Sequence, residues 1–191
     1  MRAEGPAEGR ADGRADGRRA RGDRRRRAIL EAVLRVVERD GVAGVGHRSV
    51  AREAGVPTTS TTYYFATLDD LLTAALLWAA DELAADFHAA CCAPGATPEA
   101  VARFLADALG PRRGRTVAEY ELYLLAARRP ELRPAARRWI DLFTAASSAP
   151  DPVAFRAFLA AVDGLLIQGL IADVPPTEQQ LTPVVSVLMP P

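Results

Sequence analysis

A short run of hydroxyl and phenol side chains in the amino-terminal third of the chain has the chemistry needed to contact nucleic acid. Residues 58–64 are Thr-Thr-Ser-Thr-Thr-Tyr-Tyr. Serine, threonine and tyrosine hydroxyls form hydrogen bonds with phosphates and base edges, and the threonine methyl group can touch the methyl group of thymine. Because serine and threonine rank low in helix propensity, a helix built from them indicates that its exposed face has a second role.

The residues around this run predict a helix-turn-helix, the motif that places a short helix in the major groove of DNA. Val50, Ala51 and Ala54 share one face of the helix that precedes the run. Gly55 suits the left-handed conformation that ends a helix, and Pro57 suits the start of the next one. We expect the major groove to be contacted by Thr58, Thr59, Ser60, Thr61 and Tyr63, and phosphates by Arg27, His47, Arg48 and Tyr64.

Longer helices are predicted on both sides of this motif. An apolar stripe predicts a helix over 24–40, and Thr67 with Asp70 forms the pattern of a capping box at the start of another. The helices expected from there onward lie at about 68–90, 98–109, 116–128, 131–146, 152–173 and 177–188. The sequence therefore predicts an all-α fold of about nine helices, with a helix-turn-helix domain over 23–67 and a second helical domain over 68–191.

The segment from Ile29 to about Leu76 resembles the amino-terminal domain of the TetR family of bacterial transcriptional regulators. The matching elements are Ile29-Leu30-Glu31-Ala32, Glu38-Arg39-Asp40-Gly41, Arg48, Val50-Ala51, Glu53-Ala54-Gly55-Val56, Ser60-Thr61-Thr62-Tyr63-Tyr64-Phe65 and Leu71-Leu72, in one register without gaps. The resemblance implies a homodimer, a double-stranded DNA operator and a carboxy-terminal domain that binds a small-molecule effector. It favours a repressor that a mostly apolar effector releases from a palindromic operator.

Three positions depart from the family pattern. Gly46 and Pro57 replace the usual small polar caps of the two short helices, and Leu68 replaces a lysine that contacts phosphate in the family. The missing lysine leaves open a helical small-molecule-binding protein or enzyme with a vestigial helix-turn-helix. A further alternative is an architectural DNA binder driven by its arginine-rich amino terminus.

Charge is distributed unevenly, although the net charge of the chain is zero. Residues 1–67 carry 14 arginines and 9 carboxylates, residues 68–191 carry 10 arginines and 15 carboxylates, and the chain has no lysine. A basic front half fits a DNA-facing end. Residues 1–22 are poor in apolar side chains, so we expect a disordered, arginine-rich arm. The arginines of 18–27 either follow DNA phosphates or belong to a solvated tail.

The predicted helix over 152–173 is apolar almost all round. Such a helix is buried on both sides, which in a chain of this size favours a second subunit over an ordinary interior position. The last helix would complete a four-helix interface, as in the family. The predicted interface residues are Ala160, Gly164, Ile167, Ile171, Leu181, Val184, Val185 and Leu188.

Aromatic side chains of the second domain predict a mostly apolar ligand site. The candidates are Trp78, Phe104, Tyr120, Tyr123, Trp139 and Phe143, with Gln168 as a polar anchor. Aromatic residues at helical spacing also build ordinary cores, and this alternative stays open for each of them.

The sequence gives little support to catalysis, to a cofactor or to a metal site. The two histidines, His47 and His88, are not part of any zinc-ligand spacing, and no glycine-rich loop follows a strand. The adjacent Cys91 and Cys92 are either inert thiols or a strained redox pair. We therefore expect a protein that is not an enzyme. Since we find neither a secretory signal nor an apolar run of transmembrane length, we also expect it to be cytoplasmic and to have no membrane contact.

Overall fold

The computed structural model describes residues 9–92, 96–145 and 151–189. Its helices are α1 (Gly9–Asp40), α2 (His47–Ala54), α3 (Thr58–Tyr64), α4 (Leu68–Phe87), α5 (Pro98–Leu109), α6 (Arg113–Leu125), α7 (Arg133–Ala145), α8 (Pro152–Ile171) and α9 (Glu178–Leu188). Short helical turns, η1 (Val42–Gly44), η2 (His88–Cys92) and η3 (Pro130–Leu132), join some of them. No strand occurs within these described ranges, so the all-α prediction is confirmed.

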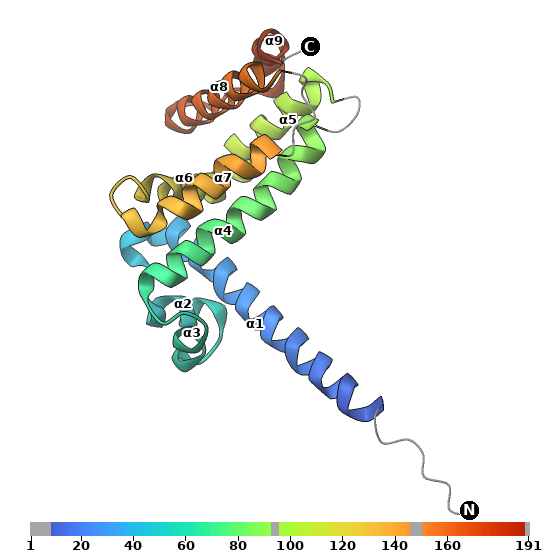
Figure 1. The fold of residues 1–191 in the computed structure, drawn as a ribbon. Coiled ribbons are helices and arrows are strands. Elements are labelled where there is room, and N and C mark those ends of the chain that lie inside the picture. The colour runs from blue at the N-terminus through green and yellow to red at the C-terminus, as the bar shows by residue number, and fades with distance from the viewer. Residues whose placement is uncertain (1–8, 93–95, 146–150, 190–191) are drawn as a thin grey trace, which may run out of the picture.

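Helix α1 begins much earlier than we predicted, and within the described residues this corrects the expected disorder over 9–22. The helix runs unbroken from Gly9 to Asp40, and its amino-terminal half projects away from the rest of the molecule (Figure 1). The buried half, which includes Ile29 and Val33, supplies the nucleus, and extension then adds residues one at a time. The arginines and alanines of the extension are strong helix formers, although the glycines and aspartates between them are not. Residues 1–8 lie outside the described part.

The first three helices and the start of α4 share one apolar core. The buried stripe of α1, with Ile29 and Val36 fully enclosed, packs against Val50 of α2, Phe65 and Leu72. The predicted capping box is confirmed, since the Thr67 N–H donates to the Asp70 carboxylate at 2.9 Å and the Asp70 N–H donates to the Thr67 hydroxyl at 3.0 Å. Helix α4 therefore begins at a fixed point directly after α3.

The second domain is built on the far half of α4, with α5 to α9 around it (Figure 1). Its core is formed by apolar side chains such as Phe87, Leu105, Phe158 and Val185. Several predicted boundaries moved. Helix α4 passes into a π-helical turn at His88, α6 covers 113–125 rather than 116–128, and α8 ends at Ile171 rather than at residue 173. Cys91 and Cys92 belong to that turn, but their side chains lie outside the described part.

The two domains share a contact at the carboxy-terminal end of α1. Helix α6 packs against α1, and the Glu121 carboxylate of α6 accepts a hydrogen bond of 3.0 Å from the Val42 N–H. A second link joins Arg129, after α6, to Asp69 at the start of α4, at 2.6 Å. The Glu121 contact therefore gives the second domain a point from which to act on the first, and the Arg129 ion pair joins the end of α6 to the start of α4.

Helix α8 is the one described helix that is long and apolar enough to cross a membrane by length and composition. Core helices of soluble proteins meet the same criterion, and Arg156 and Asp163 both lie within this helix. Helix α8 carries apolar side chains that packing within this chain leaves exposed.

Candidate DNA-binding surface and ligand cavity

The turn between α2 and α3 forms as the sequence predicts. The Ser49 hydroxyl accepts a hydrogen bond of 2.9 Å from the Gly46 N–H and donates one of 2.8 Å to the Gly44 carbonyl, which fixes the start of α2. Gly55 ends α2 with φ 65°, in the left-handed region where glycine carries no Cβ penalty. Pro57 then occupies the cap position of α3.

Several predicted DNA-contacting side chains are exposed on this motif. Thr58 and Thr59 face solvent, the Tyr63 side chain is 83% exposed, and Arg48 is exposed on α2. Ser60, His47 and Tyr64 are half-buried, and they keep part of their surface available. Thr62, which the sequence analysis did not select, is exposed as well and points its hydroxyl to the Thr58 and Thr59 carbonyls. Contact of these residues with DNA remains a prediction.

The structure corrects the prediction for Thr61, because this side chain does not face the side of α3 that would contact DNA. Its side chain is fully buried, and its hydroxyl donates to the Thr58 carbonyl at 2.7 Å and lies 3.3 Å from the His47 carbonyl of α2. A buried hydroxyl must be hydrogen-bonded, and this one also holds α3 against α2. Sequence reasoning failed here because α3 has hydroxyls on every side, so composition did not show which face packs inward.

We therefore expect Thr61→Ala to destabilise the domain and to leave base preference unchanged. The variant loses a buried hydrogen bond and a methyl contact, which together are worth about 1 to 2 kcal/mol. Thermal unfolding followed by circular dichroism should show a lower midpoint. Selection of binding sites from a random duplex pool should return the wild-type motif, with the exposed Thr59→Ala as the variant that alters it. A changed motif for Thr61→Ala would contradict the burial.

Arg27 is paired with carboxylates, but its side chain is 58% exposed, so its contact with phosphate stays a prediction. Its guanidinium pairs with Glu31 at 3.1 Å and with Glu82 of α4 at 3.3 Å. His47 keeps its predicted place at the first turn of α2, and its Nδ1 atom is buried without a hydrogen-bond partner in the described part of the chain.

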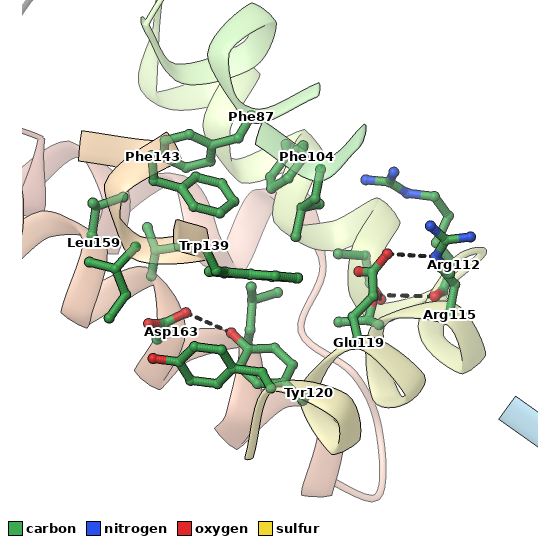
Figure 2. Close-up of a pocket in the computed structure, with 17 residues that line it drawn as sticks. Phe87, Phe104, Arg112, Arg115, Glu119, Tyr120, Trp139, Phe143, Leu159 and Asp163 are labelled. Carbon is green, nitrogen blue, oxygen red and sulfur yellow. Dashed lines mark hydrogen bonds and ion pairs between the residues drawn. The ribbon is translucent and has the colours of Figure 1, made fainter. Parts of the chain in front are cut away.

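A cavity lies in the second domain, between the aromatic side chains of α4 to α8 (Figure 2). It measures about 90 Å³, well above the room that one water molecule needs, so it is more than a packing defect. Five of the predicted ligand residues line it: Phe104, Tyr120, Tyr123, Trp139 and Phe143. Phe143 packs edge-to-face on Phe87 with ring centroids 5.1 Å apart, so the wall also belongs to the core.

Two predicted ligand residues lie elsewhere. Trp78 packs against the core around α1 and does not line the cavity, and Gln168 is exposed on α8. The helix period explains the second error, since Gln168 is turned away from the side of α8 that carries the buried Phe158 and Val162. The polar residues of the cavity are instead Arg112, Arg115, Thr116, Glu119 and Asp163. Two signals were available in the sequence: Asp163 interrupts an apolar helix, and Glu119 follows Arg115 by one turn.

The two cavity carboxylates differ in their partners. The Glu119 carboxylate accepts a hydrogen bond of 2.5 Å from Arg115 Nε, and its residue is 5% exposed. Asp163 accepts a hydrogen bond of 2.8 Å from the Tyr120 hydroxyl (Figure 2), and no arginine pairs with it among the described residues. Burial raises the pKa of Glu119, although Arg115 lowers it in part, and burial also raises the pKa of Asp163 against the opposing effect of Tyr120.

Among the residues that the structure describes, these pairings leave one negative charge without a counter-ion beside an aromatic wall. Carboxylates and aromatic faces both attract cations, since the ring faces carry partial negative charge. Asp163 is exposed to solvent, so a ligand that enters the cavity would meet its charge. The arrangement fits an aromatic cation better than an anion or a sugar.

Helices α8 and α9 carry exposed apolar side chains in a stripe. Ile171 is 80% exposed and Val187 is 85% exposed, and Ile167 and Val184 are more than 40% exposed. A Cβ atom placed on Gly164 would meet nothing within 4 Å, so packing inside this chain does not require a glycine there. Glycine inside a helix costs about 0.5–1 kcal/mol relative to alanine, which points to a close approach from outside the chain.

Part of the predicted interface is internal. Leu181 is 2% exposed and Val185 is fully buried, because this side of α9 packs on α5. Leu181 and Val185 are therefore corrected, because they do not belong to the surface of the protomer. The other predicted interface residues keep exposed surface: Ala160, Ile167, Ile171 and Val184 are exposed, and Gly164 and Leu188 are half-buried. Sequence alone did not separate the two faces of α9, since both carry apolar side chains, with valine on each.

Comparison with known proteins identifies the family. Residues 94–191 match a model described as the tetracyclin repressor-like carboxy-terminal domain. The multidrug binding protein EbrR, crystallised with ethidium, is 44% identical, with 87% of this chain and 99% of that chain covered and a TM-score of 0.70. The chain belongs to the TetR family. Another member of the TetR family, from Streptomyces coelicolor A3, is 43% identical over the same shares of both chains, with a TM-score of 0.73.

TetR-family membership confirms the resemblance seen in residues 29–76. EbrR has also been crystallised with proflavin and with malachite green. No curated protein sequence matches this chain. Proteins of the TetR family are transcriptional regulators, and the relatives of this chain include a protein that binds ligands. Membership of the family therefore supports ligand-responsive regulation of transcription.

Proposed function

We propose that this protein is a dimeric transcriptional repressor that releases a palindromic operator when a lipophilic aromatic cation enters the cavity of the second domain. The observation that carries the proposal is the carboxylate of Asp163, which has no arginine partner in the described chain and lies beside Tyr120 and Trp139. The bound ligands of EbrR support it, since ethidium, proflavin and malachite green are aromatic cations.

The DNA half of the proposal rests on the exposed side chains of α2 and α3. Thr58, Thr59 and Tyr63 would enter the major groove, with Arg48 on phosphate. Two such helices in a dimer would contact half-sites about one helical turn, or roughly 34 Å, apart. The dimer would form through the exposed apolar stripe of α8 and α9. This use of α8 favours a cytoplasmic dimer over a membrane span.

Two experiments test the function. Selection of binding sites from a random duplex pool should yield a palindrome with half-sites about ten base pairs apart. Calorimetry with tetraphenylphosphonium, an aromatic cation that does not intercalate into DNA, should then show binding that weakens when the selected duplex is present. Salt-sensitive binding without sequence preference would instead support an architectural protein, and cation binding without DNA binding would support a vestigial helix-turn-helix.

Acidification should weaken the binding of this cation. Burial raises the pKa of Glu119 and of Asp163, so these carboxylates take up protons at a higher pH than exposed ones do. A protonated carboxyl carries no charge, whereas tetraphenylphosphonium keeps its charge at every pH. Affinity should therefore fall on acidification, and the fall should begin at a higher pH than the titration of an exposed carboxylate. Triphenylphosphine oxide, which is neutral and of similar shape, should bind equally well as the pH falls. A parallel fall for both compounds would indicate that the fold, and not the charge, is changing.

The amino-terminal half of α1 would add phosphate contacts. The Cβ position of Gly22 lies 3.5 Å from the Tyr64 hydroxyl of α3, and the Arg26 guanidinium lies 5.4 Å from the centre of the Phe65 ring. This face of α1 is therefore the one nearest the DNA that α3 would bind. Arg19 shares it, since it precedes Gly22 by about one turn. We propose that α1 follows the phosphates with this face.

A pair of double variants tests the face. Replacing Arg19 and Arg26 with glutamine should lower operator affinity and reduce the slope of log affinity against log salt by about 2, because each lost phosphate contact removes about 0.9. Arg21 and Arg24 are exposed on other faces, so their replacement with glutamine should change the slope much less. Equal slopes for both pairs would identify the extension as a solvated tail.

A further inference from the structure

Trp78 is in contact with an arginine from each domain. It lies on α4 outside the cavity, with the Arg115 guanidinium of α6 at 5.0 Å from its ring centre and the Arg27 guanidinium of α1 at 5.9 Å. Both distances fall within the range of cation–π attraction. A single ring is therefore shared by a helix of the DNA-binding domain and a helix of the ligand-binding domain.

Both arginines are also held by carboxylates. On the cavity side, Arg115 pairs with Glu119, which lines the cavity and whose side chain is 7% exposed. On the other side, Arg27 pairs with Glu82 of α4 at 3.3 Å. Contacts thus run without interruption from a cavity carboxylate through Arg115 and Trp78 to α1.

The start of this series responds to charge. Glu119 and Arg115 neutralise each other in a site that is largely removed from water, where electrostatic interactions are strong. A cation that enters the cavity attracts the Glu119 carboxylate and repels Arg115. It therefore weakens the Arg115–Glu119 ion pair, and Arg115 is free to change its position on the Trp78 ring.

The end of the series reaches the recognition helix. Arg26, next to Arg27 on α1, lies over the ring of Phe65, the residue that ends α3. Helix α1 also packs along α2. A displacement of α1 near Arg27 is thus transferred to both helices of the helix-turn-helix.

We propose that Arg115 couples the cavity to the DNA-binding domain: a bound cation takes its place at Glu119, and the shared Trp78 ring passes the change to Arg27 and α1. Arg115 is a positioning residue in this scheme, because it acts on DNA through other residues. The proposal rests on the proposed function and adds to it a specific route.

The test separates ligand affinity from coupling. The coupling factor is the ratio of the tetraphenylphosphonium dissociation constants measured with and without the selected operator duplex, and for allosteric proteins it is typically about 5 to 150. We expect Arg27→Gln to leave the dissociation constant without DNA within about twofold of wild type while the coupling factor falls to about 1. Arg115→Gln should also lower the factor to about 1, with cation binding retained or strengthened, because Glu119 loses its competing partner.

A matched control and a second readout keep the test independent of folding. Arg103→Gln also removes an arginine from one ion pair, with Glu178, but lies on the surface of α5 outside the cavity, so it should keep the wild-type coupling factor. The chain has two tryptophans, so Trp139→Phe leaves Trp78 as the only one. Its emission should change when the cation saturates this variant, and the change should disappear when Arg115→Gln is added.

The outcomes are distinct. A wild-type coupling factor in both Arg115→Gln and Arg27→Gln, with unaltered Trp78 emission on cation binding, would overturn the proposed route while the function stands. Absence of cation binding by the wild-type protein, measured without DNA, would instead show that the proposed function fails, and the route with it.

Discussion

Placing an arginine at Gly164 is expected to yield a folded monomer whose operator affinity is lower by about 100-fold or more. A dimer gains its affinity by binding the second half-site intramolecularly, an advantage of about 10²–10⁴ that a monomer loses. The monomer itself should keep its stability, because a Cβ at Gly164 meets nothing within 4 Å and because removal of a helical glycine favours the helix.

Sedimentation and duplex binding measure the two effects. The sedimentation coefficient should change from that of a dimer to that of a monomer, with the circular dichroism spectrum unchanged. Ala85→Arg is a suitable control, since Ala85 is an exposed helical alanine on α4, outside the stripe. A dimeric Gly164→Arg protein would show that the exposed stripe of α8 and α9 is not the interface.

Asp163→Asn is expected to reduce the affinity for tetraphenylphosphonium by roughly 10- to 100-fold. Two opposite unit charges about 6 Å apart at an effective dielectric constant of about 20 attract each other by about 2–3 kcal/mol, and each 1.4 kcal/mol corresponds to a factor of ten. Asparagine has nearly the same shape and can still accept the hydrogen bond from Tyr120, so the cavity should persist.

Two comparisons make this result specific to charge. Triphenylphosphine oxide should bind the wild-type protein and Asp163→Asn equally, since it carries no charge to lose. Asp141→Asn removes an exposed carboxylate of α7 that does not line the cavity, and it should leave both affinities unchanged. Unaltered cation affinity in Asp163→Asn would place the counter-ion elsewhere and would exclude Asp163 as the anchor.

Local chemistry explains why the sequence predicted the helix-turn-helix so closely. Gly55, Pro57 and the Thr67–Asp70 capping box act through their own backbone or through neighbours three residues away, and the structure shows each in its expected role. Family resemblance over residues 29–76 rests on the same local pattern. The all-α class followed similarly from helix periods and breaks.

Errors arose wherever a property depended on which side of a helix meets another helix. Thr61 and its exposed neighbour Thr62 have the same chemistry, and only the packing of α3 on α2 decides that Thr61 is buried. Leu181 and Val184 on α9 differ in the same way, because α5 covers the first and leaves the second exposed.

The cavity shows the same division between sequence and tertiary structure. Aromatic residues at helical spacing predicted a ligand site, and five of them line the cavity. The charge of the cavity was not predicted. Glu119 comes from α6 and Asp163 from α8, and only folding brings these two helices to the same cavity. Sequence by itself determined the helices, their caps and the family, since these depend on short-range interactions. Tertiary packing alone decided which side chains are buried, which carboxylate lacks a counter-ion, and that Trp78 lies between arginines of the two domains.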